Sequence, residues 1–524
     1  MMKEKINLFL SKIRNLIGKP VISKIIFIAL GISSTIWFLL RVIPKPQRAT
    51  YPCMKAAAPL MSTFVVYLLT FSGSVFAFQK AKYHFQKAKF IYAASFFIIA
   101  TFCTFIFLTN NTEEVYASTI DTNSVMSNSP VGVERGIFPG RVVWVFDPKV
   151  ATWDGSNKYW WDEKSTSQIE TDKILTSTLT SLTGKKTEAK AWDALFKNFN
   201  EEKKNVKKGY SPDQKIAVKI NQNNTLRYAD TTGLNASPQL VYALIRSLTK
   251  EAEVPQKNIT IFDASRFISD NIFNKCHKDF PEVLFVDNEG GNGRIKSTYV
   301  DMAIPYSVDN GKLATGLATC AVEADYLINM ALLKGHVGQG VTLCGKNLYG
   351  ATSIDRNWRK NAHNNFNQDR QGKDKYMTFT DFLGHKDPGG KTLLFMIDGF
   401  YAARSQDGPP LIKDKWKMAP FNNRWSSSLF ASQDGVALDA VGIDFLRSEW
   451  PDLADIAYTE KYLVEAALAN NPLSQTFYDP ERDGSRLNSL GVMEHWNNAD
   501  EKKYSRNLGK NYGIELVYVP INAE

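Results

Sequence analysis

The sequence predicts an α/β protein, with a mainly parallel sheet and helices on both of its faces, preceded by an all-α anchor of three transmembrane helices. Three observations support this fold class. Apolar strand-like runs alternate with amphipathic helical segments from residue 141 onward, which is typical of βαβ units. Three uncharged apolar segments lie near the N terminus. Positive charge is concentrated there too, because the first 110 residues hold 14 Lys and Arg but one acid, Glu4.

The apolar segments 25–40, 56–78 and 90–109 predict the membrane anchor. Each is long enough to span or nearly span a hydrocarbon core of about 30 Å as a helix. Ten Lys and Arg lie in the N-terminal arm and in the loop between the second and third segments, whereas five lie on the opposite side. Since positive loops stay in the cytoplasm, we expect the N terminus inside and the C-terminal part outside the cytoplasm. The lipid bilayer is therefore an expected partner.

The domain organisation follows from these patterns. Residues 1–109 form the three-span anchor, residues 110–136 a polar linker, and residues 137–524 an exported α/β domain. Beyond residue 110 the chain has 49 basic and 52 acidic residues, so this part is close to neutral. A nucleic-acid-binding domain needs a basic face of its own, and no nucleic-acid partner is therefore expected.

The cysteines limit the choice of cofactor. The sequence has no C-x-x-C motif, so neither a zinc ribbon nor an iron–sulfur cluster of ordinary spacing is expected. Cys276, Cys320 and Cys344 lie in the predicted exported domain and allow at most one disulfide among them. The sequence leaves open whether that disulfide forms, since a free Cys is commonly a small core residue.

Six strand-like runs define the predicted sheet, with helices between them, for instance at 239–250 and 267–278. The runs are RVVWVF (141–146), KIAVKI (215–220), ITIFDA (259–264), VLFVD (283–287), YLINMALL (326–333) and LLFMID (393–398). Polar residues stand where these strands end, and ligands of open α/β sheets bind at the carboxyl ends of the strands. The residues at the strand ends are Lys219, Asn221, Asp263, Ser265, Arg266, Lys334, His336 and Asp398.

The segment 324–350 is the most informative, because it gathers one His, two Lys and several Gly around a strand end. A helix is expected from about residue 342 to 348, and it carries Lys346 and Asn347. A His, several cations and two Asp at one rim suit an anionic ligand held by cations, with His or Asp moving protons. Each of these residues could instead form a surface ion pair or cap a helix.

Six sequence segments between residue 138 and the C terminus resemble those of a known family. They are PGRVVWVFDP, KIAVKIN, ADYLINMALLKGH, GVTLCGKNLYG, IDGFYAAR and SLFASQDGVALDAVGIDFL. They resemble the bacterial family known as domain of unknown function 362. The resemblance implies an α/β architecture but no established activity. Together with the predicted anchor, it implies a multi-pass protein of the bacterial inner (cytoplasmic) membrane with an extracytoplasmic C-terminal domain. Many relatives carry ferredoxin-like Cys clusters, which this chain does not have.

A shorter stretch is similar to the nickel-pincer lactate racemases. His336, Gly340 and Lys346 match a His, a Gly-containing loop and the Lys that holds the cofactor, and His363 matches a later nickel ligand. The resemblance implies proton transfer by His336. This chain reads DASR (263–266) where the racemases have a second catalytic His, and a domain threaded across a membrane does not easily carry a cofactor attached in the cytoplasm. We therefore expect no nickel-pincer cofactor, and Lys346 then binds a carboxylate or phosphate near the start of its helix.

Carboxylates offer a competing chemistry. Asp434, Asp439 and Asp444 recur every five residues, a step of about 140° on a helix, so they cannot share one face. Asp434 is expected to cap the helix that follows it. Asp439 could join Asp398 on a divalent cation, with His363 as a further candidate ligand, which would suit hydrolysis of a phosphate or sulfate ester.

Aromatic residues gather at the N-terminal edge of the predicted exported domain, where they either stack on sugars or pack in the core. They are Trp153, Tyr159, Trp160 and Trp161. His277, His385 and His495 are expected in surface or capping roles.

We predict an enzyme that acts on an anionic small molecule by acid–base chemistry at the strand ends, of an isomerase (racemase-like) or hydrolase type. The expected catalytic residues are His336, Lys346 and Asp398. The expected substrate-binding residues are Lys219, Asn221, Ser265, Arg266, Lys334 and Asn347. The candidate metal ligands are Asp398, Asp439 and His363. Two alternatives stay open: a non-catalytic extracytoplasmic module that binds a glycan or peptide, and a metal-dependent ester hydrolase.

Overall fold

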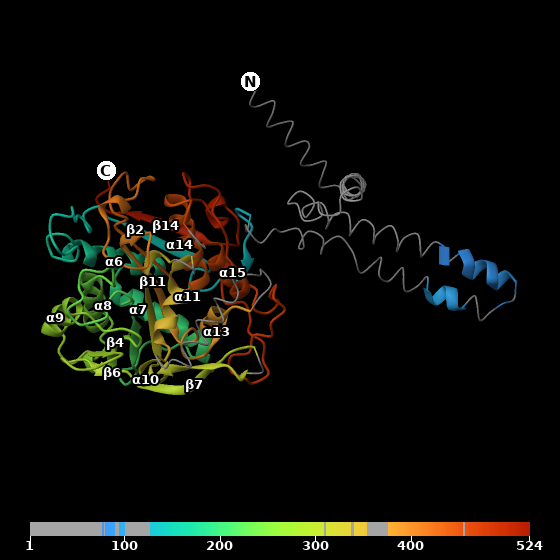
Figure 1. Cartoon of the computed structure of the whole chain (residues 1–524), viewed down its shortest axis with the longest axis horizontal. Helices are drawn as coiled ribbons and strands as arrows, with labels where there is room; N and C mark the ends of the chain where they lie inside the picture. Colours follow the sequence, from blue (N-terminus) through green and yellow to red (C-terminus); the bar gives the residue numbers. More distant parts are fainter. Residues whose placement is uncertain are drawn as a thin grey trace, which may run out of the picture. The chain divides into compact units, whose positions relative to one another are not determined.

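The structure is a computed structural model of the chain, which divides into two compact units, Met1–Asp121 and Thr122–Glu524. The residues that it describes are 76–77, 79–87, 89, 94–99, 126–308, 311–336, 340–353, 376–453 and 456–523. The strands and helices discussed below belong to the second unit (Figure 1).

Most of the predicted anchor lies outside the described residues. The segment 25–40 lies wholly outside them, whereas 56–78 and 90–109 contribute only residues 76–77 and 94–99, which are helical. No helix among the described residues is both long and apolar enough to cross a membrane. The predicted fold class is corrected on this point, because the architecture that the structure describes includes no transmembrane helix.

The central sheet has ten strands, in the order β14-β2-β12-β11-β9-β3-β4-β5-β6, with β10 paired to β9 outside this path. Their bounds are β2 Arg141–Phe146, β3 Ile216–Lys219, β4 Ile259–Asp263, β5 Leu284–Asp287, β6 Ile295–Lys296, β9 Tyr326–His336, β10 Gly340–Thr342, β11 Thr392–Ala403, β12 Ser428–Ser432 and β14 Glu515–Pro520. All six predicted strands are therefore confirmed. Each predicted end lies within three residues of the observed end, except the C-terminal end of β11.

The predicted direction of the strands was wrong in part, because the protein has mixed sheets. The strands β11, β9, β3, β4, β5 and β6 run parallel, and β14 is parallel to β2. In contrast, β12 is antiparallel to both β11 and β2, and β10 is antiparallel to β9. Two small sheets, β1 (Val131–Gly132) with β13 (Val492–Met493) and β7 (Tyr299–Pro305) with β8 (Ala314–Ala318), are also antiparallel. Between β11 and β12 the chain forms no α-helix, and a parallel return would need such a crossover.

Helices cover both faces of the central sheet, as predicted (Figure 1). The helices of one face are α6 Gln168–Thr183, α7 Glu188–Lys204, α8 Pro238–Lys250 and α9 Asp270–Asp279. Those of the other face are α10 Thr319–Glu323, α11 Cys344–Asn347, α13 Thr378–Gly384, α14 Gly435–Glu449 and α15 Ile456–Ala467. The two faces have separate hydrophobic cores, and β2 contributes alternate residues to each, with Trp144 on the α14 face and Val143 on the α6 face.

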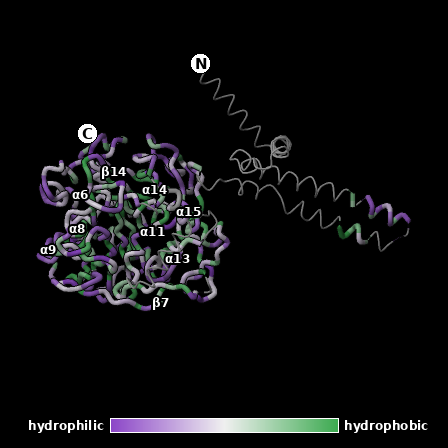
Figure 2. The backbone as a smooth tube through the Cα atoms, viewed as in Figure 1, coloured by the Kyte–Doolittle hydropathy of each residue, from purple (hydrophilic) through white to green (hydrophobic). Residues whose placement is uncertain are grey.

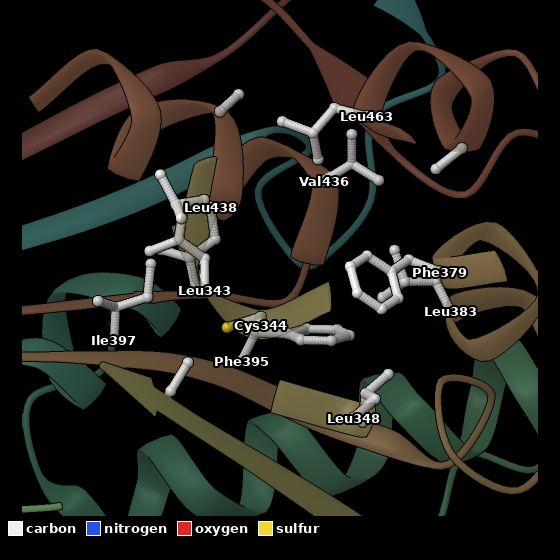
Figure 3. Packing of buried hydrophobic residues seen from close by; sticks show 14 of the residues in the cluster. Leu343, Cys344, Leu348, Phe379, Leu383, Phe395, Ile397, Val436, Leu438 and Leu463 are labelled. Carbon is white, nitrogen blue, oxygen red and sulfur yellow. The ribbon is translucent and has the colours of Figure 1, made fainter. Parts of the chain in front are cut away.

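The core on the α14 face brings together segments that are distant in sequence. Figure 3 shows Leu343 and Cys344 beside Ile397 and Phe395 of β11, under Leu438 of α14. Hydrophilic residues gather along the outer loops of the unit, whereas hydrophobic residues concentrate inside it (Figure 2). This pattern is typical of a sheet buried on both faces.

The order of the parallel strands reverses between β3 and β9. From β3 the chain adds β4, β5 and β6 in one direction along the sheet, and it then adds β9 and β11 on the other side of β3. Ligands of open α/β sheets bind at such a reversal of strand order, outside the carboxyl ends of the strands.

Candidate functional site at the carboxyl ends of β3 and β9

The carboxyl ends of β3 and β4 carry a buried ion pair. Lys219 ends β3 and is fully buried, and its Nζ lies 3.3 Å from Oδ2 of Asp263 at the end of β4. The same Nζ donates to Oδ1 of Asn347 at 3.2 Å and to a main-chain carbonyl at 2.5 Å. Asp263 also accepts from the amide of Gln222 at 2.9 Å and from Oγ of Ser265 at 3.0 Å. Each buried charge is thus compensated, as a desolvated ion requires.

Asn347 of α11 connects this ion pair to β9. Its Oδ1 accepts from Lys219 and from Nδ2 of Asn221, each at 3.2 Å. Its Nδ2 donates to Oδ1 of Asn329 in β9 at 2.8 Å, and Asn329 donates to the carbonyl of Cys344 at 2.9 Å. An amide can link the two strands because it carries both donors and acceptors. The predicted residues Lys219, Asn221 and Asn347 therefore lie together.

Gly350 packs directly on the ion pair. It lies in a 3-10 turn, Leu348–Ala351, that follows α11. A Cβ added there would lie 2.7 Å from Nζ of Lys219 and 3.2 Å from Oδ1 of Asp263. A side chain at this position would therefore force the Lys219 ammonium group to shift.

Lys334 lies farther along β9, covered by two loops. Its side chain has no exposed surface, and its Nζ donates to the carbonyls of Gln406 at 3.2 Å and Leu234 at 3.5 Å. Burial lowers the pKa of Lys334 to about 7, although the carboxylates of Asp407 and Asp263 act in the opposite direction. Both protonation states are therefore populated at neutral pH, which is a property of lysines that transfer protons or act as nucleophiles.

Three more of the predicted residues have half-buried side chains. His336 ends β9, and residues 337–339 after it lie outside the described part of the chain. Arg266 follows β4 and donates to two main-chain carbonyls at 3.1 and 3.0 Å. Lys346 lies on α11, one residue before Asn347. The predicted cations are thus carried by the neighbouring strands β3, β4 and β9 and by the helix that follows β9.

The start of α11 is occupied by a protein carboxylate. Asp439 of α14 accepts from the amides of Cys344 and Gly345, both at 2.8 Å, and also from the hydroxyl of Tyr462. Burial raises the pKa of Asp439 to about 6. The carboxylate takes up the two N–H groups near which Lys346 was expected to hold an anion, so any ligand of Lys346 has to reach it from another side.

Asp398 and Asp439 lie on opposite faces of the sheet. Asp398 accepts from the amides of Ser237 at 2.8 Å and Phe400 at 3.2 Å, beside the start of α8, whereas Asp439 belongs to α14. Burial raises the pKa of Asp398. The remaining candidate ligand, His363, lies outside the described residues. Within the described part, no group of three His, Cys, Asp or Glu side chains could hold a metal ion.

The three cysteines of the second unit are free thiols. Cys276 and Cys344 are buried in the separate cores of the two faces, and Cys320 is half-buried. Burial raises the pKa of all three thiols, that of Cys320 to about 12. They are therefore protonated at neutral pH and unsuited to nucleophilic chemistry.

Sequence reasoning missed some buried polar residues. Asn329 lies within the apolar run YLINMALL, and a polar residue at such a position was the available signal. His385 and His495 are buried, so neither has a surface role. His385 has the alternative capping role, because it is the C-cap residue of α13 and its Nδ1 accepts from the amide of Asp387 at 3.1 Å. Nδ1 of His495 lies 2.5 Å from Oδ1 of Asp444, and its Nε2 lies 3.2 Å from Oε1 of Glu460. These partners are distant in sequence, so spacing could not reveal them.

Asp434 caps α14, as predicted. It precedes α14, and its Oδ1 accepts from the amides of Val436 at 3.1 Å and Ala437 at 2.9 Å. The three Asp at five-residue spacing thus have three separate structural roles, at the start of α14, at the start of α11 and beside His495.

Comparison with known proteins bears on the same part of the chain. Residues 216–444 match the model of a protein family described as Domain of unknown function (DUF362). No curated protein and no solved structure gives a significant match to the chain. The matched residues run from the start of β3 into α14 and include the site residues from Lys219 to Asp439. The part of the chain that builds the site at β3 and β9 is therefore the part that is similar to the family of domain of unknown function 362.

Proposed function

We propose that the protein binds a small anionic molecule at the carboxyl ends of β3 and β9 and carries out acid–base chemistry on it. The main support for this proposal is that Lys219, Lys334 and Asn347 lie on or beside β3 and β9, the two strands between which the strand order reverses. In open α/β sheets, ligands bind in the crevice at this point.

Lys334 and His336 are the proton-transfer groups in this proposal. They lie two residues apart on β9, so their side chains leave the strand on the same side. The lowered pKa of Lys334, about 7, supports this role. Imidazole groups also titrate close to neutral pH, so the two side chains together can supply a base and an acid.

Arg266 and Lys346 are the groups that bind the anion. Both are half-buried, so their interaction with a bound carboxylate or phosphate is less screened by water than at a fully exposed site. Asp398 has a positioning role, because its carboxylate holds the main chain at the start of α8. The metal-dependent hydrolase gains no support, since Asp398 and Asp439 lie on opposite faces.

The location outside the cytoplasm, next to a bilayer, is part of the same proposal and rests on the charge of the predicted loops alone. A fusion of alkaline phosphatase, which is active only outside the cytoplasm, to residue 523 should be active in bacteria. An inactive phosphatase fusion, paired with an active cytoplasmic reporter at the same residue, would contradict this location.

Calorimetric titration of the full chain with L-lactate, D-lactate and inorganic phosphate at pH 7 tests the binding part of the proposal. We expect at least one of these anions to bind. Lys346→Met should weaken that binding by roughly tenfold or more, because a hydrogen bond to a charged group contributes about 1.5–3 kcal/mol. Lys215→Met is the matched control, since Lys215 is exposed at the opposite end of β3.

The chemical part is tested by nuclear magnetic resonance in deuterated water. If lactate binds, the wild type should exchange its C2 proton for deuterium, and His336→Ala should stop the exchange while binding persists. The anion site is refuted if none of the three anions binds, or if Lys346→Met and Lys215→Met weaken binding equally. Binding without any exchange would restrict the proposal to a binding protein.

A further inference from the structure

A second site lies in an open pocket next to the aromatic segment 159–163. The pocket has a volume of about 630 Å³ and lies between this segment, the start of α8 and the first turns of α9. Its lining includes Tyr159, Trp161, Asp162, Gln239, Asn271 and Lys275. None of these residues belongs to the proposed anion site, so the pocket requires its own explanation.

Two aromatic rings form one wall of the pocket. The ring centroids of Tyr159 and Trp161 lie 4.7 Å apart with an angle of 31° between the planes, and both side chains are half-buried. Nε1 of Trp161 donates to the carbonyl of Thr231 at 2.6 Å, which fixes the indole ring. The adjacent Trp160 is 1% exposed and belongs to the core. The fixed aromatic surface thus comes from Tyr159 and Trp161, and such a surface packs well against the C–H groups of a flat ligand.

Polar groups of the same pocket lack partners. Gln239 is 1% exposed, and its Nε2 donates to the carbonyl of Trp161 at 2.6 Å, so its Oε1 is held in the acceptor orientation. This Oε1 and Oδ1 of Asn271 are buried without a hydrogen-bond partner. Buried acceptors normally have donors, and a ligand rich in hydroxyl groups would supply them.

The charge of the pocket argues against an anionic ligand. Its lining includes three carboxylates and one cation, Lys275. Lys275 forms an ion pair with Glu163, and Asp270 lies 2.8 Å from the guanidinium of Arg294. The third carboxylate, Asp162, accepts from a main-chain amide at 3.0 Å. No lining cation is thus left for an anion, so an anionic ligand does not fit this pocket.

We propose that this pocket binds one or two rings of a neutral saccharide. The apolar face of a sugar ring packs on Tyr159 and Trp161, and its hydroxyl groups donate to Gln239, Asn271 and the carboxylates at the rim. Aromatic side chains together with amide and carboxylate acceptors match the mixed apolar and hydroxylated surface of a sugar. The anion site and this pocket then recognise two different chemical classes.

Saturation-transfer magnetic resonance on the full chain tests the proposal with three neutral probes: maltotriose, cellotriose and the trimer of N-acetylglucosamine. At least one probe should receive saturation from the protein. Trp161→Ala should reduce its affinity by roughly tenfold, because the stacking surface is lost. Trp153→Ala is the matched control, since Trp153 is half-buried nearby, stacks on Trp425 and does not line the pocket.

Gln239→Leu provides an independent test, because leucine has nearly the same side-chain volume as glutamine but no acceptor oxygen. It should weaken saccharide binding while leaving the melting temperature close to that of Trp153→Ala. The proposal fails if none of the three saccharides binds, or if Trp161→Ala and Trp153→Ala have equal effects. A peptide that binds in a Trp161-dependent manner when no saccharide does would assign the pocket to peptides and would also overturn it.

Discussion

Replacement of Lys334 by methionine should change how the stability of the protein depends on pH. The unfolded chain holds the lysine proton up to about pH 10.5, whereas burial lowers the pKa in the folded state to about 7. The unfolded state therefore binds more protons between pH 7 and 10.5, and stability rises with pH in that window. From the two pKa values, Lys334 makes the wild type about 2 kcal/mol more stable at pH 9 than at pH 7. Lys334→Met lacks this rise.

Urea unfolding at pH 7, 8 and 9, followed by tryptophan fluorescence, measures the effect. Loss of the hydrogen bonds to the carbonyls of Gln406 and Leu234 also destabilises the variant, by about 1–3 kcal/mol, but this contribution does not depend on pH. The difference in unfolding free energy between wild type and Lys334→Met should therefore grow with pH. Lys215→Met should show no such trend. If the unfolding free energies of the wild type and of Lys334→Met change by the same amount from pH 7 to 9, Lys334 is protonated in the folded state.

Three further substitutions probe buried contacts, each measured by urea unfolding. Asp439→Ala should destabilise the protein by about 2–3 kcal/mol at pH 7, because two buried N–H groups lose their acceptor. Since burial raises the pKa of Asp439 to about 6, wild-type stability should fall from pH 4 to 6 relative to this variant, and equal slopes would contradict the shift. Asp444→Ala should destabilise the protein by about 3–5 kcal/mol, because it leaves the buried His495 without its partner. Asp193→Ala, which breaks an exposed ion pair with Lys197, should have a far smaller effect, and equal losses for the two variants would refute the buried role of Asp444. Gly350→Ala should destabilise by about 1–3 kcal/mol through its contact with Lys219, and a neutral effect would show that the lysine yields.

The strands were the most predictable part of the fold. A run such as RVVWVF is apolar on both sides and rich in β-branched residues, so it predicts a strand that is buried on both faces, and β2 occupies these six residues. The direction of β12 was not predictable from its own residues. Its orientation depends on a return from β11 without a helix, and the apolar pattern of a strand is the same in either direction.

The candidate site was predictable to a similar degree. Lys219, Asn221 and Asn347 were identified from their positions at strand and helix ends, and the structure places them in one hydrogen-bond network. The roles of Asp398 and Asp439 were not predictable. A carboxylate on a strand or helix binds whichever main-chain amides the fold brings near it, and both carboxylates face N–H groups from other elements.

By itself, the sequence determined which segments form strands, that helices separate most of them, and that polar residues stand at the strand ends, because these features follow from local periodicity and residue type. The tertiary structure alone decided that the strand order reverses between β3 and β9, that Lys334 is buried under two loops, and that Asp398 and Asp439 lie on opposite faces. These properties depend on which surfaces pack together across long sequence separations. Local patterns carry no information about such contacts, and they set both the burial of Lys334 and its lowered pKa.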